Sequence, residues 1–90
     1  MSYTIEFTLK ALEGIEELKK SGNKPLLKKL RKLLDELTEH PFSGTVQPEQ
    51  LRHNLVGFWS RRLNREHRIV YTVDQQKIVV TIISIKGHYT

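Results

Sequence analysis

The 90-residue sequence contains no cysteine. This absence excludes disulfides, thiolate catalysis and cysteine-ligated metal sites together. No apolar run exceeds a few residues, so no segment is long enough to span a membrane. The first six residues lack the charged and apolar regions of a signal peptide. These absences lead us to expect a cytosolic protein without a membrane segment.

Composition and charge are those of a small, basic, globular protein. Apolar residues make up 38% of the chain and charged residues 28%, and the length is typical of one domain covering residues 1–90. The net charge is +5. A basic domain binds polyanions through counterion release, so nucleic acid is a candidate partner, although basic surfaces also occur without one. The arginines that follow residue 50 are interleaved with aromatic residues, unlike the lysines before it.

The chain opens with a predicted strand followed by a helix. Residues 3–7 alternate polar and apolar side chains, as expected of a short strand. Thr8 is well placed to cap the helix that follows. Leu12, Ile15 and Leu18 recur at three-residue spacing, which predicts one apolar stripe on this helix until a Ser-Gly-Asn break ends it.

A second helix is predicted between Lys24 and His40. Pro25 suits its first turn, and Pro41 pushes the preceding residue out of helical conformation. Six leucines follow the i, i+3, i+4 pattern and are assigned to the core: Leu26, Leu27, Leu30, Leu33, Leu34 and Leu37. Two amphipathic helices in series predict a helical hairpin that covers one face of a sheet.

The second half of the chain predicts strands. Residues 41–57 form a loop with a short strand near 51–54, and three strands follow at 58–63, 68–73 and 78–85. The predicted fold class is α+β, with the N-terminal strand and the helical hairpin packed on one face of a small antiparallel sheet.

Two charged residues in this half are candidates for chemistry on a phosphate. Glu49 is either a solvated loop carboxylate or a general base whose pKa is lowered by nearby arginines. Strand alternation puts Ile69 toward the helices and Arg68 on the open face. There Arg68 could stabilise the charge of a pentacoordinate phosphorus, or form an ordinary cross-strand ion pair with Glu66. Spacing alone does not decide between these options.

The end of the chain adds a histidine and an aromatic residue. His88 is either a frayed terminal residue or a general acid placed over a cleft. Tyr89 could stack on a base. The remaining histidines have no metal-like spacing, so we expect no metal site and no cofactor. Phe58 and Trp59 are interpreted as packing residues.

Taken together, these motifs resemble the YoeB/Txe branch of the RelE/ParE toxin superfamily of bacterial toxin–antitoxin modules. The matching segments are residues 41–44, 48–55, 57–62, 66–71 and 87–89. The combination of Trp-Ser-Arg-Arg, Glu-His-Arg-x-Val-Tyr and a terminal His-Tyr is specific, whereas each fragment alone is weak.

The resemblance implies a RelE-like fold, similar to small microbial ribonucleases, and a ribosome-dependent cut in mRNA at the A site. It places the general base on Glu49, the transition-state arginine on Arg68 and the general acid on His88. It also implies a substrate-binding group: Tyr89, Arg61, Arg62, Arg52 and His53. The product would be a 2′,3′-cyclic phosphate, formed without a metal.

The implied partners are a cognate antitoxin of the YefM/Axe type, the 70S ribosome with its mRNA, and operator DNA only through the antitoxin complex. The sequence leaves a homodimer open. Two other functions also stay open: a ParE-like toxin that acts on DNA gyrase without cutting RNA, and a non-enzymatic RNA-binding or protein-interaction module.

Overall fold

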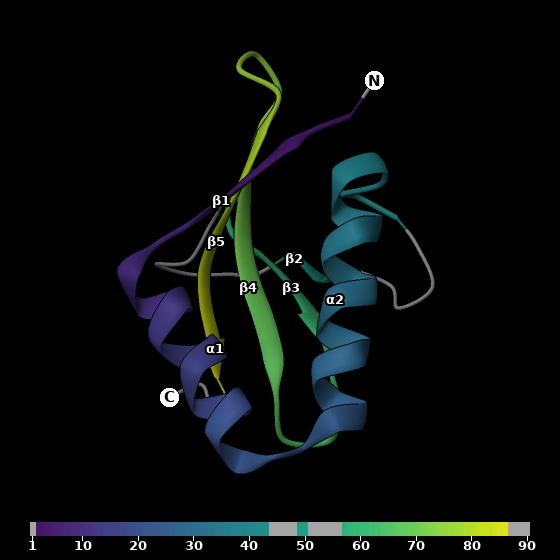
Figure 1. Ribbon diagram of the computed structural model, residues 1–90. Helices are drawn as coiled ribbons and strands as arrows, with labels where there is room; N and C mark the ends of the chain where they lie inside the picture. The colour runs from purple at the N-terminus through teal and green to yellow at the C-terminus, as the bar shows by residue number, and fades with distance from the viewer. Residues whose placement is uncertain (1, 44–48, 51–56, 87–90) are drawn as a thin grey trace.

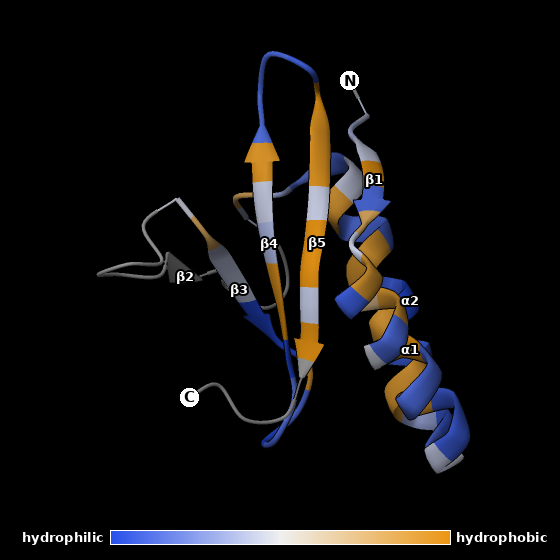
Figure 2. Cartoon of the chain, turned by 90° about the vertical axis from the view of Figure 1, so that its left-hand side faces the viewer, coloured by the Kyte–Doolittle hydropathy of each residue, from blue (hydrophilic) through white to orange (hydrophobic). Residues whose placement is uncertain are grey.

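The computed structural model describes residues 2–43, 49–50 and 57–86 of the chain. Two helices lie on one face of a five-stranded sheet, as Figures 1 and 2 show. The elements in chain order are β1 (Thr4–Phe7), α1 (Leu9–Ser21), α2 (Lys24–Glu39), β2 (Glu49–Gln50), β3 (Trp59–Arg62), β4 (Arg68–Asp74) and β5 (Val79–Lys86). The predicted α+β class and helical hairpin are confirmed.

The sheet is mixed rather than wholly antiparallel. Its strand order is β1-β5-β4-β3-β2, and β1 runs parallel to β5 while the other pairs are antiparallel. The sequence predicted that β1 would pack on a face of the sheet, and this detail was wrong. An uncovered edge of β5 would leave backbone groups without partners, and β1 supplies them. The parallel direction of β1 relative to β5 fits the short connection to α1, because β1 ends at Phe7 and α1, which packs on β5, begins at Leu9.

Thr8 connects β1, α1 and β5. Its side-chain oxygen accepts a hydrogen bond from the Ala11 amide at 3.1 Å, which confirms it as the cap of α1. The same hydroxyl donates to the Ile83 carbonyl at 2.6 Å. Ile83 is the extra residue of a β-bulge, since Val70 pairs with Ser84 and Tyr71 pairs with Ile82. Thr8 therefore satisfies a carbonyl that the ladder with β4 skips.

Helix α1 contacts the sheet through two small residues and one leucine. Its buried positions are Ala11, Gly14 and Leu18, whereas Leu12 is 47% exposed. The predicted stripe through Leu12 was therefore wrong at that position. A Cβ atom on Gly14 would lie 2.5 Å from the carbonyl oxygen of Ile85, so the helix approaches β5 as closely as its backbone allows.

Helix α2 follows the sequence prediction. Asn23 caps it by accepting from the Leu26 amide, proline occupies the first turn, and it ends at Glu39 with His40 as its C-cap. Leu26, Leu30, Leu33 and Leu37 are buried in the core, with Leu27 and Leu34 partly buried against it. The leucine stripe is confirmed as core.

Strands β3, β4 and β5 lie within one residue of their predicted bounds. The short strand predicted at 51–54 lies outside the described residues, and β2 appears at Glu49–Gln50 instead, in a stretch predicted to be loop. Ile69 and Tyr71 belong to the core beneath the helices, which confirms the predicted alternation in β4. The opposite face (hereafter the outer face) is not uniformly open, because Ser60, Val70 and Ser84 are buried there.

Candidate functional site

The outer face of the sheet carries a row of basic residues across three strands. Arg62 on β3 pairs directly with Arg68 on β4, and Arg68 pairs with Lys86 on β5. Arg62 is exposed and Arg68 is half-buried. Like charges placed directly opposite one another destabilise a sheet. A row of this kind is favourable when an anion lies over it, because bound phosphate or carboxylate offsets the repulsion.

Within residues 2–43, 49–50 and 57–86, no carboxylate forms a salt bridge with Arg62 or Arg68. The alternative interpretation of Arg68, an ion pair with Glu66, is therefore not observed in that part of the chain. The Glu66 amide instead donates to the Asn64 side chain in the β3–β4 turn. The guanidinium of Arg68 is available for an external anion as far as the described residues are concerned.

The strand that carries Glu49 lies next to this basic row. Glu49 pairs with Ser60 on β3, Ser60 pairs with Val70, and Val70 pairs with Ser84. On each strand, these residues are two positions away from the residue of the basic row: Ser60 from Arg62, Val70 from Arg68 and Ser84 from Lys86. Because residues two apart in a strand share a face, both sets belong to the same face of the sheet. Only β3 therefore separates the strand of the predicted base from the strand of the predicted transition-state arginine.

The other predicted site residues lie outside the described residues. These are Arg52, His53, His88 and Tyr89. For His88 and Tyr89, the described residues show only where β5 ends. Lys86 ends β5 opposite Arg68, and His88 follows two positions later in the sequence.

Arg61 lies on the helix side of the sheet, away from Arg62. Its side chain is fully buried, at 0% exposure, and its register partner Ile69 belongs to the core. The sequence grouped Arg61 with Arg62 as substrate-binding residues, and burial corrects this for Arg61. Adjacent residues in a strand point to opposite faces, so strand alternation alone could have separated the two.

Arg61 is held by polar groups on the helix side. Nε donates to the Tyr71 hydroxyl at 3.4 Å, and Nη1 donates to Glu36 Oε1 at 3.5 Å. Nη2 donates to the carbonyls of His40 and Ser43. Burial raises the pKa of Tyr71, and the hydrogen bond and positive charge of Arg61 oppose that rise. The phenol is therefore protonated throughout the physiological pH range.

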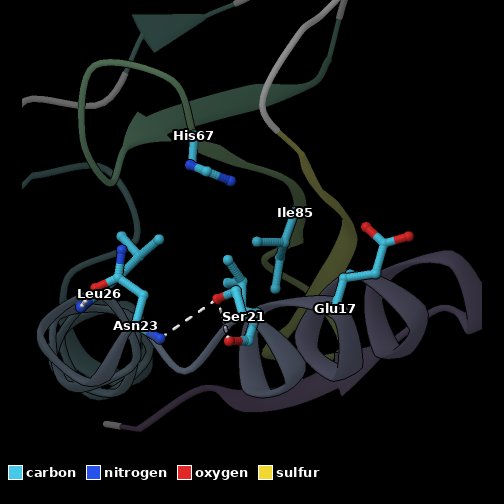
Figure 3. A pocket seen from close by; sticks show the side chains of 8 residues that line it. Glu17, Ser21, Asn23, Leu26, His67 and Ile85 are labelled. Carbon is cyan, nitrogen blue, oxygen red and sulfur yellow. Dashed lines mark hydrogen bonds between the residues drawn. The ribbon is translucent and has the colours of Figure 1, made fainter.

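A hollow of about 270 Å³ lies elsewhere, between the α1–α2 connection and the β3–β4 turn (Figure 3). Its apolar side is formed by Leu18, Leu26 and Ile85, and Ser21 and His67 are among its polar residues. These polar groups have structural partners. The Ser21 hydroxyl donates to the Leu18 carbonyl, and the His67 ring nitrogen Nδ1 lies 3.1 Å from the Asn64 side-chain oxygen. None of its lining residues was a predicted site residue.

Two further findings bound the chemistry of the described residues. No three His, Asp or Glu side chains among them gather closely enough to hold a metal ion. No helix among them is both long and apolar enough to cross a membrane.

The fold is that of small bacterial toxins. In solved structures, the YoeB/ParE toxin from Agrobacterium tumefaciens superposes with a TM-score of 0.87 at 29% identity, covering 96% of this chain and 99% of that one. The YoeB dimer from Staphylococcus aureus gives a TM-score of 0.82 at 37% identity, with 99% and 100% covered.

The sequence comparisons narrow this class to one family. The family described as YoeB-like toxin of bacterial type II toxin–antitoxin system matches residues 7–89. Toxin YoeB from Synechocystis sp. is 44% identical over 68 residues, which are 76% of this chain and 77% of that protein. Toxin YoeB from Escherichia coli K12 is 40% identical over 67 residues, covering 74% and 77%. The chain belongs to the YoeB-like family of type II toxin–antitoxin toxins.

Proposed function

We propose that this toxin is an endoribonuclease that cuts mRNA in the ribosomal A site, with Glu49, Arg68 and His88 as its catalytic residues. The observation that carries the proposal is the basic row on the outer face, where Arg62 and Arg68 oppose one another without a described carboxylate between them. The register of Glu49 beside that row and the course of β5 toward it support the same site.

The proposed reaction needs only side chains. Glu49 accepts the proton of a ribose 2′-hydroxyl, and the 2′-oxygen attacks the adjacent phosphorus. Arg68 donates hydrogen bonds to the nonbridging phosphate oxygens, which carry added negative charge in the pentacoordinate transition state. The bond from phosphorus to the 5′-oxygen breaks, and His88 donates a proton to that oxygen. The products are a 2′,3′-cyclic phosphate and a 5′-hydroxyl end.

Substrate binding is assigned to residues around this centre. Arg62 adds a second guanidinium beside Arg68, and two basic groups suit the consecutive phosphates of a single strand. Arg52, His53 and Tyr89 complete the proposed binding group, with Tyr89 stacking on a base. Arg61 is removed from this group because its side chain is buried.

The proposed partners follow from the same family. Solved structures include a YoeB–YefM complex and a YoeB dimer, both from Staphylococcus aureus. We infer a YefM-like antitoxin for this chain, whose acidic groups would be steered to the net positive toxin. Binding of operator DNA would occur only through the toxin–antitoxin complex, and a homodimer is the alternative assembly. Action on translating 70S ribosomes places the toxin in the cytoplasm.

The experiment is cleavage of a defined mRNA by the purified toxin, with and without programmed ribosomes, followed by mapping of the new ends. We expect cuts inside the A-site codon that carry a 2′,3′-cyclic phosphate. Arg68→Ala should lower the rate about 10²–10³-fold, as loss of one transition-state donor does. His88→Ala should lower it about 10²–10⁴-fold, as loss of a general acid does.

Arg65→Ala is the matched control, because Arg65 is an exposed arginine in the β3–β4 turn and lies outside the basic row. It should cut at the wild-type rate. Cutting of naked RNA alone would replace the ribosome-dependent function by that of a free ribonuclease. Folded protein that cuts neither substrate would refute the proposal, and an assay of gyrase inhibition would then test the ParE-like alternative.

A further inference from the structure

The buried guanidinium of Arg61 joins three parts of the chain. From β3 it reaches the Tyr71 hydroxyl on β4, the Glu36 carboxylate on α2, and the carbonyls of His40 and Ser43. The Tyr71 hydroxyl in turn donates to the Pro41 carbonyl at 2.7 Å. We call Arg61, Tyr71 and Glu36, with the three carbonyls of 40–43, the Arg61 cluster.

The Arg61 cluster places a positive charge near the C-terminus of α2. The last turn of α2 contains no basic residue to offset the partial negative charge of its C-terminus. Arg61 supplies a cation there from the sheet, and its hydrogen bond to the His40 carbonyl satisfies a group at the end of the helix. No buried side-chain nitrogen or oxygen among the described residues lacks a hydrogen-bond partner, so the buried charge is compensated.

Stability alone does not explain an arginine at this position. Replacing a buried ion pair by well-packed apolar residues is often neutral or stabilising, so such groups are weak evidence for stability. What a planar guanidinium provides is directional hydrogen bonding in a fixed geometry. Here its donors hold residues 40–43, a segment without helix or strand, in one position against β3 and β4.

The segment that Arg61 holds leads to the strand of the proposed base. Glu49 follows Ser43 by six positions, and it pairs with Ser60, the residue next to Arg61. Phe42 packs edge-on against Trp59, with ring centroids 5.1 Å apart, and Trp59 pairs with Gln50. Strand β3 therefore contacts the start of this connection through the side chains of residues 59 and 61, and its end through the backbone ladder with β2.

We propose that Arg61 is a positioning residue: through residues 40–43 it fixes the placement of the β2 strand that carries Glu49. It touches no substrate. The catalytic part of this inference rests on the proposed endoribonuclease function, whereas the positioning itself does not. Displacement of a catalytic group by about 1 Å is enough to slow a reaction about 10²-fold.

The test compares Arg61→Lys with Val80→Ala. Lysine keeps the positive charge but cannot span the acceptors of the cluster with one ammonium group. Val80 is buried in the core on β5, away from the cluster, so Val80→Ala controls for general destabilisation. Amide hydrogen exchange is followed in peptides that contain residues 40–43 and 49–50 and in peptides from β4 and β5. Cleavage on programmed ribosomes is measured in parallel.

We expect Arg61→Lys to raise exchange at 40–43 and 49–50 selectively, by about 10-fold or more, and to lower kcat about 10–100-fold with KM unchanged. Val80→Ala should raise exchange across the sheet and leave kcat unchanged at a temperature where it is folded. If Arg61→Lys does not fold, Tyr71→Phe, which removes one oxygen of the cluster, serves in the same comparison.

Four outcomes are informative. Selective exchange together with reduced kcat supports the proposal. Exchange in Arg61→Lys that is no different in pattern from that in Val80→Ala overturns it, as does selective exchange with wild-type kcat. If the wild-type protein does not cut RNA at all, the proposed function fails, and the exchange pattern alone decides whether Arg61 positions β2.

Discussion

Substitution of Gly14 by alanine tests how closely α1 packs on β5. Alanine is the better helix former by about 0.8–1.0 kcal/mol in a helix interior, so helix propensity alone predicts a more stable protein. The structure predicts the opposite. A Cβ atom would lie 2.5 Å from the Ile85 carbonyl oxygen, about 0.9 Å short of the 3.4 Å at which ordinary van der Waals contact begins.

The neighbouring atom belongs to the backbone of β5, where Ile85 pairs with Ile69 on β4, so it cannot move aside as the end of a flexible side chain would. Helix α1 must therefore shift away from β5 by most of that distance. A gap of 0.5–1 Å forfeits about a quarter to a half of each van der Waals contact, and Ala11 and Leu18 make their core contacts on this face. Overpacking of this kind costs about 1–3 kcal/mol. After the gain in helix propensity of about 0.8–1.0 kcal/mol, we expect a net loss of up to about 2 kcal/mol.

Urea denaturation followed by circular dichroism measures the effect, and thermal melts should show a fall of about 4–8 °C per kcal/mol in a protein of this size. Lys10→Ala is the control, since Lys10 is an exposed residue of the same helix. A Gly14→Ala protein as stable as the wild type, or more stable, would refute the argument from close packing. It would show that helix propensity outweighs the contact with Ile85.

Three further predictions concern the core, a cap and a buried phenol. Leu37→Ala, at a position with 0% exposure, should cost about 2–5 kcal/mol in the free energy of unfolding, whereas Leu12→Ala should cost far less; urea midpoints decide. Thr8→Val should lose about 1–2 kcal/mol, because it removes both the α1 cap and the bond to the bulge, while Thr8→Ser stays near the wild type in the same assay. Burial raises the pKa of Tyr71 above 10.0, so the folded state keeps the phenol proton longer than the unfolded chain does. The free energy of unfolding is therefore unaffected by this group below about pH 10, and it falls as pH rises through the folded pKa. Urea midpoints measured at about pH 9 and about pH 11 should fall less in Tyr71→Phe than in the wild type.

Helix α2 was predictable because its pattern is large and regular. Six leucines at helical spacing, a proline in the first turn and a proline after the end all indicate the same element. Helix α1 was harder, because its buried face includes Ala11 and Gly14. Pattern analysis weights large apolar residues, so it selected Leu12, which is exposed. The distance between α1 and β5 decides which side chains fit between them, and the periodicity of apolar residues does not predict that distance.

The bulge in β5 could not be predicted from its sequence. Residues 78–83 are apolar or β-branched throughout, so alternation gives no register. The extra residue at Ile83 shifts the pairing by one. Without it, Arg68 would pair with Ile85, and the basic row would lose its third member. The bulge thus decides which residue of β5 stands opposite the proposed transition-state arginine.

Arg61 and Arg62 are adjacent in one motif but lie in different environments. Family resemblance treated Arg61 and Arg62 as a pair, yet the strand turns one into the core and the other outward. The roles of Glu49, Arg68 and His88 remain predictions, because they depend on chemistry that the fold makes possible without demonstrating. The motif therefore predicts the region of the site, and the pleat of β3 separates Arg61 from Arg62.

The pairing of the first strand with the last has a consequence for how the toxin is made. Thr8 bonds to a residue 75 positions later, and β1 and α1 both lie against β5. A nascent chain still lacking β5 has no strand for β1 to join and only part of the surface on which α1 packs. Loop closure over such a separation is slow relative to local contacts. During translation, the basic row therefore cannot be assembled until β5 has left the ribosome, so a chain without β5 lacks part of the proposed site.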